Sequence, residues 1–316
     1  MQCENNINRQ VIRKMLFDIS HAGIDLLQDN LFEEKKVTVS VLRLDKIHPV
    51  VSGNKLFKLH FFLQEALRSS HKTVLSFGGA YSNHLSATAF ACSALGLKSI
   101  GIVRGEQPAQ LSATLQQCIK DGMELKFISR QQYAGKENAG YLHTLQNGSG
   151  ECSIIPEGGF HPLGAKGASL IMDLVPDDNY THICTAMGTA TTMAGLLMAA
   201  RPSQKITGIP VLKGITNMEE RISHLTGYKT MPGNLEWLGD YHFGGYAKRT
   251  EELIRFMNQC WQQYRLPLDF VYTAKMFFAV LDQIRNDHFP PGSNILCLHT
   301  GGLQGNRSLP ANTLIF

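Results

Sequence analysis

The stretch TVLSFGGAYSNHLSATAFACSAL, residues 73–95, shows most directly how this chain folds. Its first five residues are mostly apolar or β-branched, which is typical of a buried strand. Two glycines then permit a tight turn, and Ser82 is a favourable N-cap for a helix that ends near Leu95. The stretch therefore predicts a strand followed directly by a helix.

The same order of strand and helix recurs along the chain. This alternation indicates an α/β protein with parallel sheets covered by helices on both faces. The most polar segment, residues 135–150, is predicted to form a loop. Further strands are predicted at residues 99–103, 125–128, 153–155, 182–185, 206–212 and 295–298, and further helices at residues 110–121, 163–174, 191–200, 250–263 and 274–285.

Length and composition restrict the class of protein. The chain has 316 residues, which exceeds the size that one hydrophobic core usually serves, so two lobes are expected. Hydrophobic residues make up 43% and charged residues 18%, an ordinary balance for a soluble globular protein. The formal net charge of +4 is too small and too evenly spread to indicate nucleic-acid binding.

Cysteine usage and hydropathy favour a cytoplasmic protein. The seven cysteines include no CxxC pair and no metal-type cluster with histidine, so we expect buried thiols in a reducing compartment and no metal site. The first thirty residues carry acids and bases throughout, which predicts that they contain no signal peptide. The most apolar stretch, residues 87–103, is interrupted by Ser93 and Lys98, and it predicts a helix and a strand instead of a membrane span.

The segment VSGNKLFKL, residues 51–59, contains a candidate catalytic lysine. Lysines are usually solvated surface charges. Lys55, however, follows Gly53, which permits the backbone to approach a ligand closely, and Asn54, whose amide can donate and accept hydrogen bonds. A lysine in such a place can form a Schiff base, provided that burial or a neighbouring cation lowers its pKa.

Two segments that follow predicted strands are rich in hydrogen-bond donors, and ligands of open parallel sheets bind beyond the carboxyl ends of strands. The helix start at residues 82–84 attracts a carboxylate or a phosphate, although a well-capped helix alone explains the same residues. The loop at residues 185–195 is small and threonine-rich, which favours a phosphate cradle. A small-residue helix packed on a sheet would give the same pattern, and the loop is neither a P-loop nor a GxGxxG motif.

Two later segments are less specific when each is taken alone. Tyr246 follows two glycines, and Tyr272 ends a short apolar run; tyrosines are usually core or interface residues. His299 precedes Thr300 and two glycines, and a lone histidine is more often structural than catalytic. Only their order after the earlier segments adds to the argument.

Taken together, these segments resemble the fold-type-II pyridoxal 5′-phosphate (PLP) enzymes, and among them the 1-aminocyclopropane-1-carboxylate (ACC) deaminase and D-cysteine desulfhydrase family. The resemblance implies a tryptophan synthase β-like α/β fold, with two open parallel-sheet domains and the site between them. Residues 1–57 and 159–316 would form the larger PLP-binding domain, and residues 58–158 the smaller domain. The family's motifs match residues 53–59, 78–84, 157–159, 162–165, 188–192, 245–246, 271–275 and 299–302.

The resemblance also assigns roles to residues. Lys55 would bind PLP as a Schiff base and, once the substrate amine displaces it, would take the Cα proton. Asn83 would lie against the cofactor ring and its 3′-hydroxyl group. Ser82, Asn83 and His84 would receive the substrate carboxylate. The catalytic set would be Lys55, Ser82, Tyr246 and Tyr272, with both tyrosines facing the substrate; Gly188, Thr189, Ala190, Thr191 and Thr192 would hold the phosphate, and Thr273 and Thr300 would sit near the pyridine nitrogen.

Two positions separate the branches of this family. ACC deaminases carry glutamate after the second tyrosine and leucine before the final glycine pair, where this chain has Thr273 and Thr300. A neutral hydroxyl group cannot stabilise a protonated pyridine as a carboxylate does. We therefore expect β-elimination from a D-amino acid, with D-cysteine giving pyruvate, hydrogen sulfide and ammonia, in preference to opening of the ACC ring to 2-oxobutyrate and ammonia.

Several positions depart from the family pattern. Tyr81, where glutamine is common, borders the expected substrate site and bears most on the substrate. Ala190 replaces a common glycine and is compatible with phosphate binding if its φ is negative. The other departures are Phe57, His60 and Ser86.

Three alternatives remain: ACC deaminase, another PLP lyase or racemase acting on serine or a related amino acid, and a PLP-binding protein that senses or stores an amino acid without turnover. Every nominal catalytic position holds a competent residue, which argues against the last. The resemblance further implies a homodimer, and the partners expected are a small amino-acid substrate, with no nucleic acid and no membrane.

Overall fold

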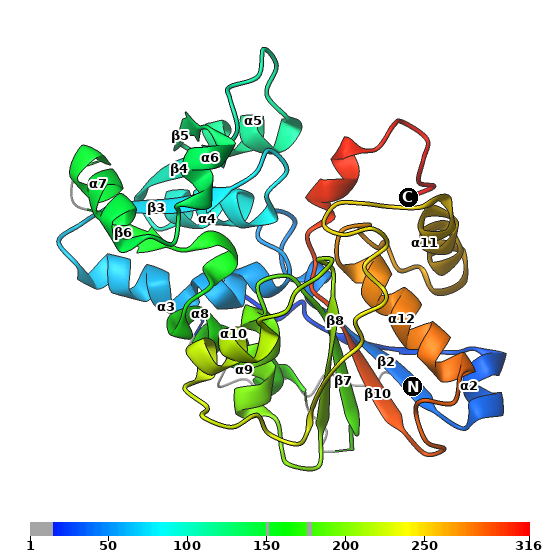
Figure 1. Ribbon diagram of the computed structural model, residues 1–316. Helices are drawn as coiled ribbons and strands as arrows, with labels where there is room; N and C mark the ends of the chain where they lie inside the picture. Colours follow the sequence, from blue (N-terminus) through cyan, green and yellow to red (C-terminus); the bar gives the residue numbers. More distant parts are fainter. Residues whose placement is uncertain (1–14, 150–151, 176–178) are drawn as a thin grey trace.

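A computed structural model describes residues 15–149, 152–175 and 179–316 of the chain (Figure 1). Within these residues the chain forms two sheets, which lie in two lobes side by side. Helices cover both faces of each sheet, because each face is apolar and must be buried. The predicted α/β class with two lobes is confirmed.

The larger sheet has six strands in the order β1-β2-β10-β7-β8-β9. β1 pairs antiparallel with β2, and the other neighbouring pairs are parallel. Alternate residues face opposite sides of the sheet: on β10, Leu296 and Leu298 join one hydrophobic cluster, whereas Ile295 and Cys297 join another. The strands are β1 Ile24–Leu27, β2 Thr38–Arg43, β7 His182–Met187, β8 Lys205–Pro210, β9 Leu235–Trp237 and β10 Asn294–His299.

Two groups of helices bury the two faces of this sheet (Figure 1). One cluster contains apolar residues of α3, α8, α9 and α10, and the other contains those of α2, α11 and α12. These helices are α2 Asn30–Lys35, α3 Asn54–Arg68, α8 Pro162–Ser169, α9 Thr191–Ala199, α10 Met218–Thr226, α11 Glu251–Tyr264 and α12 Thr273–Arg285, and the short 3-10 helices are η1 Leu44–Lys46, η2 Glu157–Gly159, η3 Leu170–Leu174 and η4 Leu303–Ser308.

The smaller sheet has four parallel strands in the order β5-β4-β3-β6. Its third strand, β3, continues into α4 through a turn in which Ser82 is the N-cap, as the opening stretch of sequence predicts. The elements are β3 Thr73–Gly78, β4 Lys98–Arg104, β5 Met123–Ile128, β6 Ser153–Ile155, α4 Asn83–Ala94, α5 Ala113–Lys120, α6 Arg130–Ala134 and α7 Ala139–Ser149.

The prediction of a loop at residues 135–150 is wrong for most of these residues. Ala139–Ser149 forms helix α7, and Gly150 lies outside the described residues. Leu142 and Leu145, three residues apart, pack against the cluster that contains Tyr133. Residues at this spacing share a helix face, so burial of two leucines outweighs the polar composition of the segment.

Several other predictions bear on the fold less directly. No helix among the described residues is long and apolar enough to cross a membrane. The six cysteines in that part of the chain are free and buried, and Cys3 lies outside it. The signal-peptide prediction concerns a segment whose residues 1–14 are also outside it. The domain boundaries after residues 57 and 158 stay predictions.

Candidate active site

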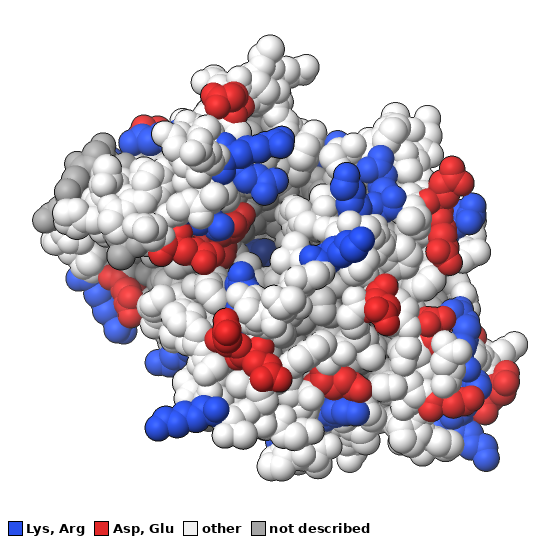
Figure 2. All heavy atoms as spheres, in the orientation of Figure 1, with Lys and Arg blue, Asp and Glu red and all other residues white. Residues whose placement is uncertain are grey.

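A cavity of about 270 Å³ lies where strands of both sheets end (Figure 2). Many of the residues that line it lie at or just after the ends of β3, β4 and β6 of the smaller sheet and of β7 and β10 of the larger one, which is where ligands of parallel sheets bind, and others come from α3. Lysine and arginine side chains stand around the hollow on this face. The predicted site residues that line it are Lys55, Ser82, Asn83, His84, Gly188, Thr189, Ala190, Thr191, Thr192, Tyr246, Tyr272 and Thr300.

Lys55 is the second residue of α3, and the start of this helix is fixed by Gly53. Gly53 has φ +73°, and a Cβ atom there would lie 1.7 Å from the Thr300 carbonyl oxygen. The Asn54 N–H donates to the same oxygen at 3.2 Å. Gly53 therefore admits the main chain of the segment after β10, and the expectation that it also admits a ligand stays a prediction.

The ammonium group of Lys55 sits in an environment that weakens its protonation. Its Nζ donates to Asn54 Oδ1 at 2.6 Å and lies 5.7 Å from the centroid of the Tyr272 ring. Burial lowers the pKa of Lys55 to about 8, and the Asp269 carboxylate acts in the opposite direction. A lowered pKa is what a lysine needs to react as a nucleophile, as stated for Lys55 in the sequence analysis.

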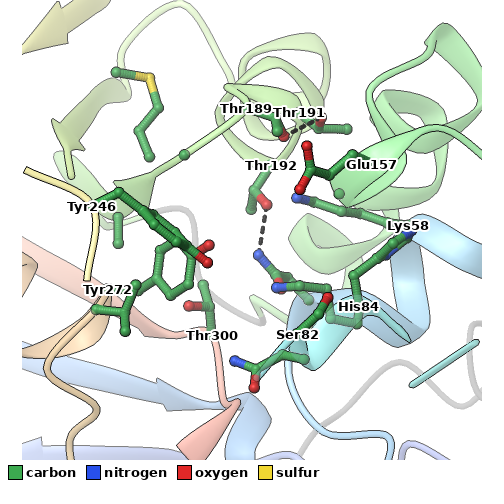
Figure 3. A pocket seen from close by; sticks show the side chains of 18 of the residues that line it. Lys58, Ser82, His84, Glu157, Thr189, Thr191, Thr192, Tyr246, Tyr272 and Thr300 are labelled. Carbon is green, nitrogen blue, oxygen red and sulfur yellow. Dashed lines mark hydrogen bonds between the residues drawn. The ribbon is translucent and has the colours of Figure 1, made fainter. Parts of the chain in front are cut away.

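Lys58 is a site residue that sequence reasoning did not single out. It lies one helical turn beyond Lys55, lines the same cavity and is 5% exposed. Burial, and then the charge of Lys55, lower its pKa well below the usual value. Figure 3 shows its side chain reaching into the cavity beside Glu157. The sequence contains a signal for it, because Lys58 is three residues from Lys55 and residues at this spacing share one face of a helix.

The start of α4 is both a capped helix and a part of the cavity wall. The Ser82 hydroxyl accepts from the Leu85 N–H at 3.2 Å. The Asn83 amide donates to the Gly302 carbonyl at 2.8 Å, whereas its buried Oδ1 has no partner among the described residues. His84 Nε2 lies 3.0 Å from Ser76 Oγ, and burial, aided by Lys55 and Lys58, lowers the pKa of His84 to about 3. His84 is therefore a neutral hydrogen-bonding group.

The threonine-rich loop connects β7 to α9, as predicted. Thr189 and Thr191 share a hydrogen bond of 2.9 Å, and Asn54 donates to the Thr192 hydroxyl at 2.7 Å. The first N–H groups of α9 have no carbonyl acceptor within the helix. Ala190 has φ +67°, so the negative φ set as the condition for phosphate binding is not found; Ala190 instead adopts the left-handed backbone that glycine favours, at the N-cap of α9. A non-glycine residue in this region costs about 1–2 kcal/mol.

Tyr272 and Tyr246 form the opposite wall (Figure 3). Tyr272 is the N-cap residue of α12, and the two rings meet edge to face with centroids 6.1 Å apart. Figure 3 shows both hydroxyl groups pointing into the cavity. Burial raises the pKa of both phenols, although 47% of Tyr246 is exposed at the mouth. Both therefore act as donors and not as bases.

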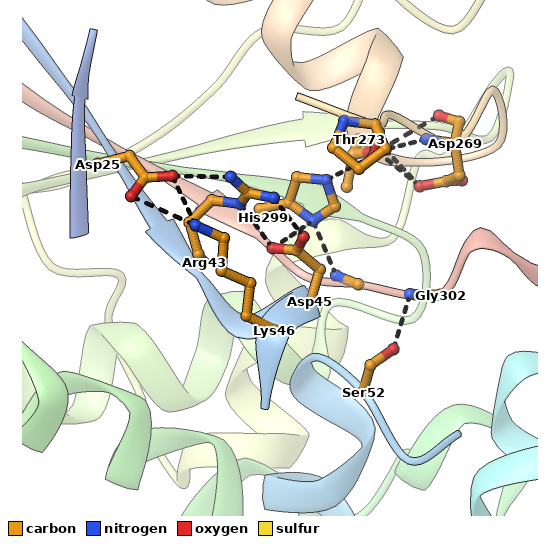
Figure 4. A network of polar contacts seen from close by, with 11 residues as sticks. Asp25, Arg43, Asp45, Lys46, Ser52, Asp269, Thr273, His299 and Gly302 are labelled. Atoms are coloured by element: carbon orange, nitrogen blue, oxygen red, sulfur yellow. Dashed lines mark hydrogen bonds and ion pairs between the residues drawn. The ribbon is translucent and has the colours of Figure 1, made fainter. Parts of the chain in front are cut away.

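Thr273 is the one predicted site residue that does not line the cavity. Its hydroxyl donates to Asp269 Oδ2 at 2.7 Å (Figure 4). The buried carboxylate of Asp269 also accepts from the N–H groups of Val271, Tyr272 and Thr273, which fixes the start of α12. The role of Thr273 near the pyridine nitrogen stays a prediction.

His299, the residue before Thr300, belongs to a buried polar network (Figure 4). His299 Nε2 lies 2.8 Å from the Pro267 carbonyl oxygen, and Nδ1 lies 3.3 Å from Asp45. Arg43 binds Asp45 through two nitrogens. Burial would raise the pKa of Asp45, but His299 and Arg43 lower it. His299 is bonded within this network and does not line the cavity, in agreement with the expectation that it is structural.

The family model for "Pyridoxal-phosphate dependent enzyme" matches residues 26–301. The chain belongs to this family. It is 31% identical, over 87% of its length and 92% of the relative's, to a Thermotoga maritima protein provisionally named 1-aminocyclopropane-1-carboxylate deaminase. It is 27% identical to the "Bifunctional D-cysteine desulfhydrase/1-aminocyclopropane-1-carboxylate deaminase, mitochondrial" of Arabidopsis thaliana, over 81% of this chain and 70% of that protein.

Solved structures confirm the fold. A structure described as an ACC deaminase homologue has a TM-score of 0.77 and 26% identity, over 94% of this chain and 95% of its own. The O-acetylserine dependent cystathionine beta-synthase of Helicobacter pylori has a TM-score of 0.66 and 14% identity, over 93% and 96%. The predicted fold-type-II architecture is therefore confirmed.

The cofactor of this PLP-dependent enzyme fits the cavity. Asn83 Oδ1, which has no partner in the part of the chain that the structure describes, suits a hydroxyl donor, and the N–H groups of the first turn of α9 suit a phosphate. Gly188 leaves room beside Tyr272, because a Cβ atom there would lie 3.2 Å from the ring. Lys55 completes the set as an amine with a lowered pKa.

Proposed function

We propose that this enzyme eliminates the β substituent of a small D-amino acid, with D-cysteine giving pyruvate, hydrogen sulfide and ammonia. The observation that carries the proposal is Lys55, a partly buried amine with its pKa lowered to about 8, in a cavity shared with Tyr272 and the start of α4. A base, a proton donor and a carboxylate site are what such an elimination requires.

The residues that would hold PLP come from both lobes. Lys55 would carry it covalently, Asn83 would contact its 3′-hydroxyl group, and Thr273 and Thr300 would lie on the side of the ring nitrogen. Residues 188–192 would bind the phosphate, whose negative charge would favour protonation of the neighbouring Lys58 amine against the effect of burial. When bound, PLP delocalises the electron pair that remains on Cα after the proton leaves.

The chain's own residues would bind the substrate and move its protons. Main-chain N–H groups of Asn83 and His84, at the positive end of α4, would hold the carboxylate. Neutral Lys55 would accept the Cα proton at Nζ. Tyr272 and Tyr246 stay protonated and would donate toward the leaving group.

Thr273 and Thr300 favour the desulfhydrase branch, because neither supplies a carboxylate to the ring nitrogen. The names of the relatives keep ACC deaminase as the second candidate. ACC has no Cα proton, so that reaction would place Ser82 and Tyr272 against the ring that opens.

The test measures keto acids released from D-cysteine, L-cysteine, D-serine and ACC by the PLP-loaded enzyme. We expect pyruvate from D-cysteine, with sulfide in equal amount, and none after Lys55→Ala. Release of 2-oxobutyrate from ACC in preference to pyruvate would identify the deaminase instead. Binding of these amino acids without any product would refute turnover and favour an amino-acid sensor.

A homodimer in the cytoplasm completes the proposal. The basis is the family resemblance for the dimer, and cysteine usage for the compartment. The Arabidopsis relative is mitochondrial by name, so cell fractionation decides the compartment. Sedimentation of the purified protein at twice the mass of one chain would support the dimer.

A further inference from the structure

Lys275 is a buried lysine that the proposed reaction does not use. It lies in the first turn of α12 and is 0% exposed. A cation is unfavourable at the start of a helix, and removing an ammonium from water is costly unless it is fully hydrogen-bonded. Burial lowers the pKa of Lys275 to about 8, opposed by Asp269. Such a group needs a structural or functional reason.

The ammonium of Lys275 binds the segment that carries Tyr246. Its Nζ donates to the His242 carbonyl at 2.9 Å and to the Gly245 carbonyl at 2.7 Å. Each carbonyl also closes a turn, because it accepts the N–H of the residue three positions later, at 2.9 Å and 3.1 Å. One cation therefore holds two consecutive turns, and Tyr246 lies at the start of the second.

These turns have a backbone that needs support. Phe243, Gly244, Gly245 and Ala247 all have positive φ, and two of the four are not glycine. Strained conformations of this kind persist only where neighbouring contacts fix them. Phe243 packs on the Phe278 ring of α12 with centroids 5.0 Å apart, whereas Gly244 and residues 246–250 are exposed, so the part that carries Tyr246 has few other contacts.

We propose that Lys275 is a positioning residue that clamps residues 242–248 and thereby sets Tyr246 against Tyr272 at the mouth of the cavity. Tyr272 precedes α12 and Lys275 lies in its first turn, so one helix start orients both tyrosines. The inference rests on the proposed function for the role of Tyr246, whereas the clamp itself is independent of it.

The first experiment needs no turnover. Lys275→Met keeps most of the volume of the unbranched side chain and removes both hydrogen bonds of the ammonium group. Trypsin cleavage after Lys248 or Arg249, followed by mass spectrometry, should be at least about tenfold faster in this variant, because the local opening of the turns is easier. Gln283→Met is the matched control: it removes a 2.6 Å hydrogen bond from the same helix to the Tyr241 hydroxyl, outside the clamp.

The second experiment is a double-mutant cycle on kcat/KM with Lys275→Met and Tyr246→Phe in the PLP-loaded enzyme. A misplaced substrate contact costs up to about 100-fold. If Lys275 acts through Tyr246, the double variant should match Tyr246→Phe alone, with unchanged borohydride labelling of Lys55. Wild-type cleavage rates in Lys275→Met, or losses that multiply in the double variant, would overturn the proposal. If no amino acid is turned over, the proposed function fails and the trypsin experiment decides the clamp.

Discussion

Replacing Lys55 with methionine in the cofactor-free protein should change how stability depends on pH. The pKa of Lys55 falls from 10.5 to about 8 on folding. Between these values the unfolded chain binds more protons than the folded one, so the free energy of unfolding rises with pH. The contribution of Lys55 to the free energy of unfolding is therefore largest above its pKa in the unfolded chain, 10.5, and is lost as the pH falls through its pKa in the folded protein, about 8.

The magnitude follows from the shift. At about 1.36 kcal/mol per pKa unit, the whole shift corresponds to about 3 kcal/mol, of which about 2 kcal/mol falls between pH 7 and pH 9.5. Lys55 is only partly buried, and solvent screening reduces this to about 1–2 kcal/mol. The buried thiols of Cys92, Cys118 and Cys260 oppose this slope, since burial raises their pKa values to about 12. They are common to both proteins and cancel in the comparison.

Urea unfolding at the two pH values measures this contribution. The increase in unfolding free energy from pH 7 to pH 9.5 should be about 1–2 kcal/mol greater in the wild type than in Lys55→Met. Lys120→Met, which alters an exposed lysine at the end of α5, is the matched control and should keep the wild-type slope. Equal slopes in the wild type and Lys55→Met would refute the lowered pKa.

Three further predictions concern the same cavity. In the PLP-loaded enzyme, kcat should fall about tenfold per pH unit on the acid side, because Lys55 must be neutral to accept a proton; a flat acid limb in stopped assays would indicate another base. Lys58→Met should stabilise the cofactor-free protein, because it removes a buried amine that has no ion-pair partner there among the described residues. The same variant should weaken PLP binding about 10–100-fold in absorbance titrations, because the phosphate loses a hydrogen-bond donor. Unchanged affinity would remove Lys58 from the phosphate site. Ala190→Gly should alter the urea midpoint little, because relief of strain offsets a lost methyl group and added chain entropy, whereas Ala190→Val should cost about 1–3 kcal/mol; equal stability of the two variants would contradict the left-handed backbone.

Local patterns in the sequence were enough to predict much of the fold. β3 and the start of α4 follow from apolar residues, two glycines and the Ser82 cap, which act within a few residues of one another. Helix α7 did not follow, because its stability comes from Leu142 and Leu145 packing on Tyr133 and its neighbours. That contact depends on tertiary structure and leaves only two leucines as a trace in a polar segment.

Much of the candidate site was also foreseen, since its parts follow strands and parallel strands end at one edge. Backbone angles were not: nothing in the loop sequence shows that Ala190 adopts φ +67°. Nor could the sequence show that the Thr273 hydroxyl would bind Asp269, or that Lys275 would bind the segment before Tyr246. These contacts depend on the three-dimensional fold and leave no local pattern in the sequence.

Borohydride reduction of the PLP-loaded protein, followed by peptide mapping, tests the central claim most directly. The account predicts a yellow protein in which reduction fixes the cofactor on Lys55 and leaves Lys58 and Lys275 unmodified. Lys55→Ala should bind PLP without a reducible bond. A phosphopyridoxyl group on Lys58 or Lys275 in the wild type, or a reducible bond that survives in Lys55→Ala, would contradict the assignment of Lys55 as the PLP-binding base.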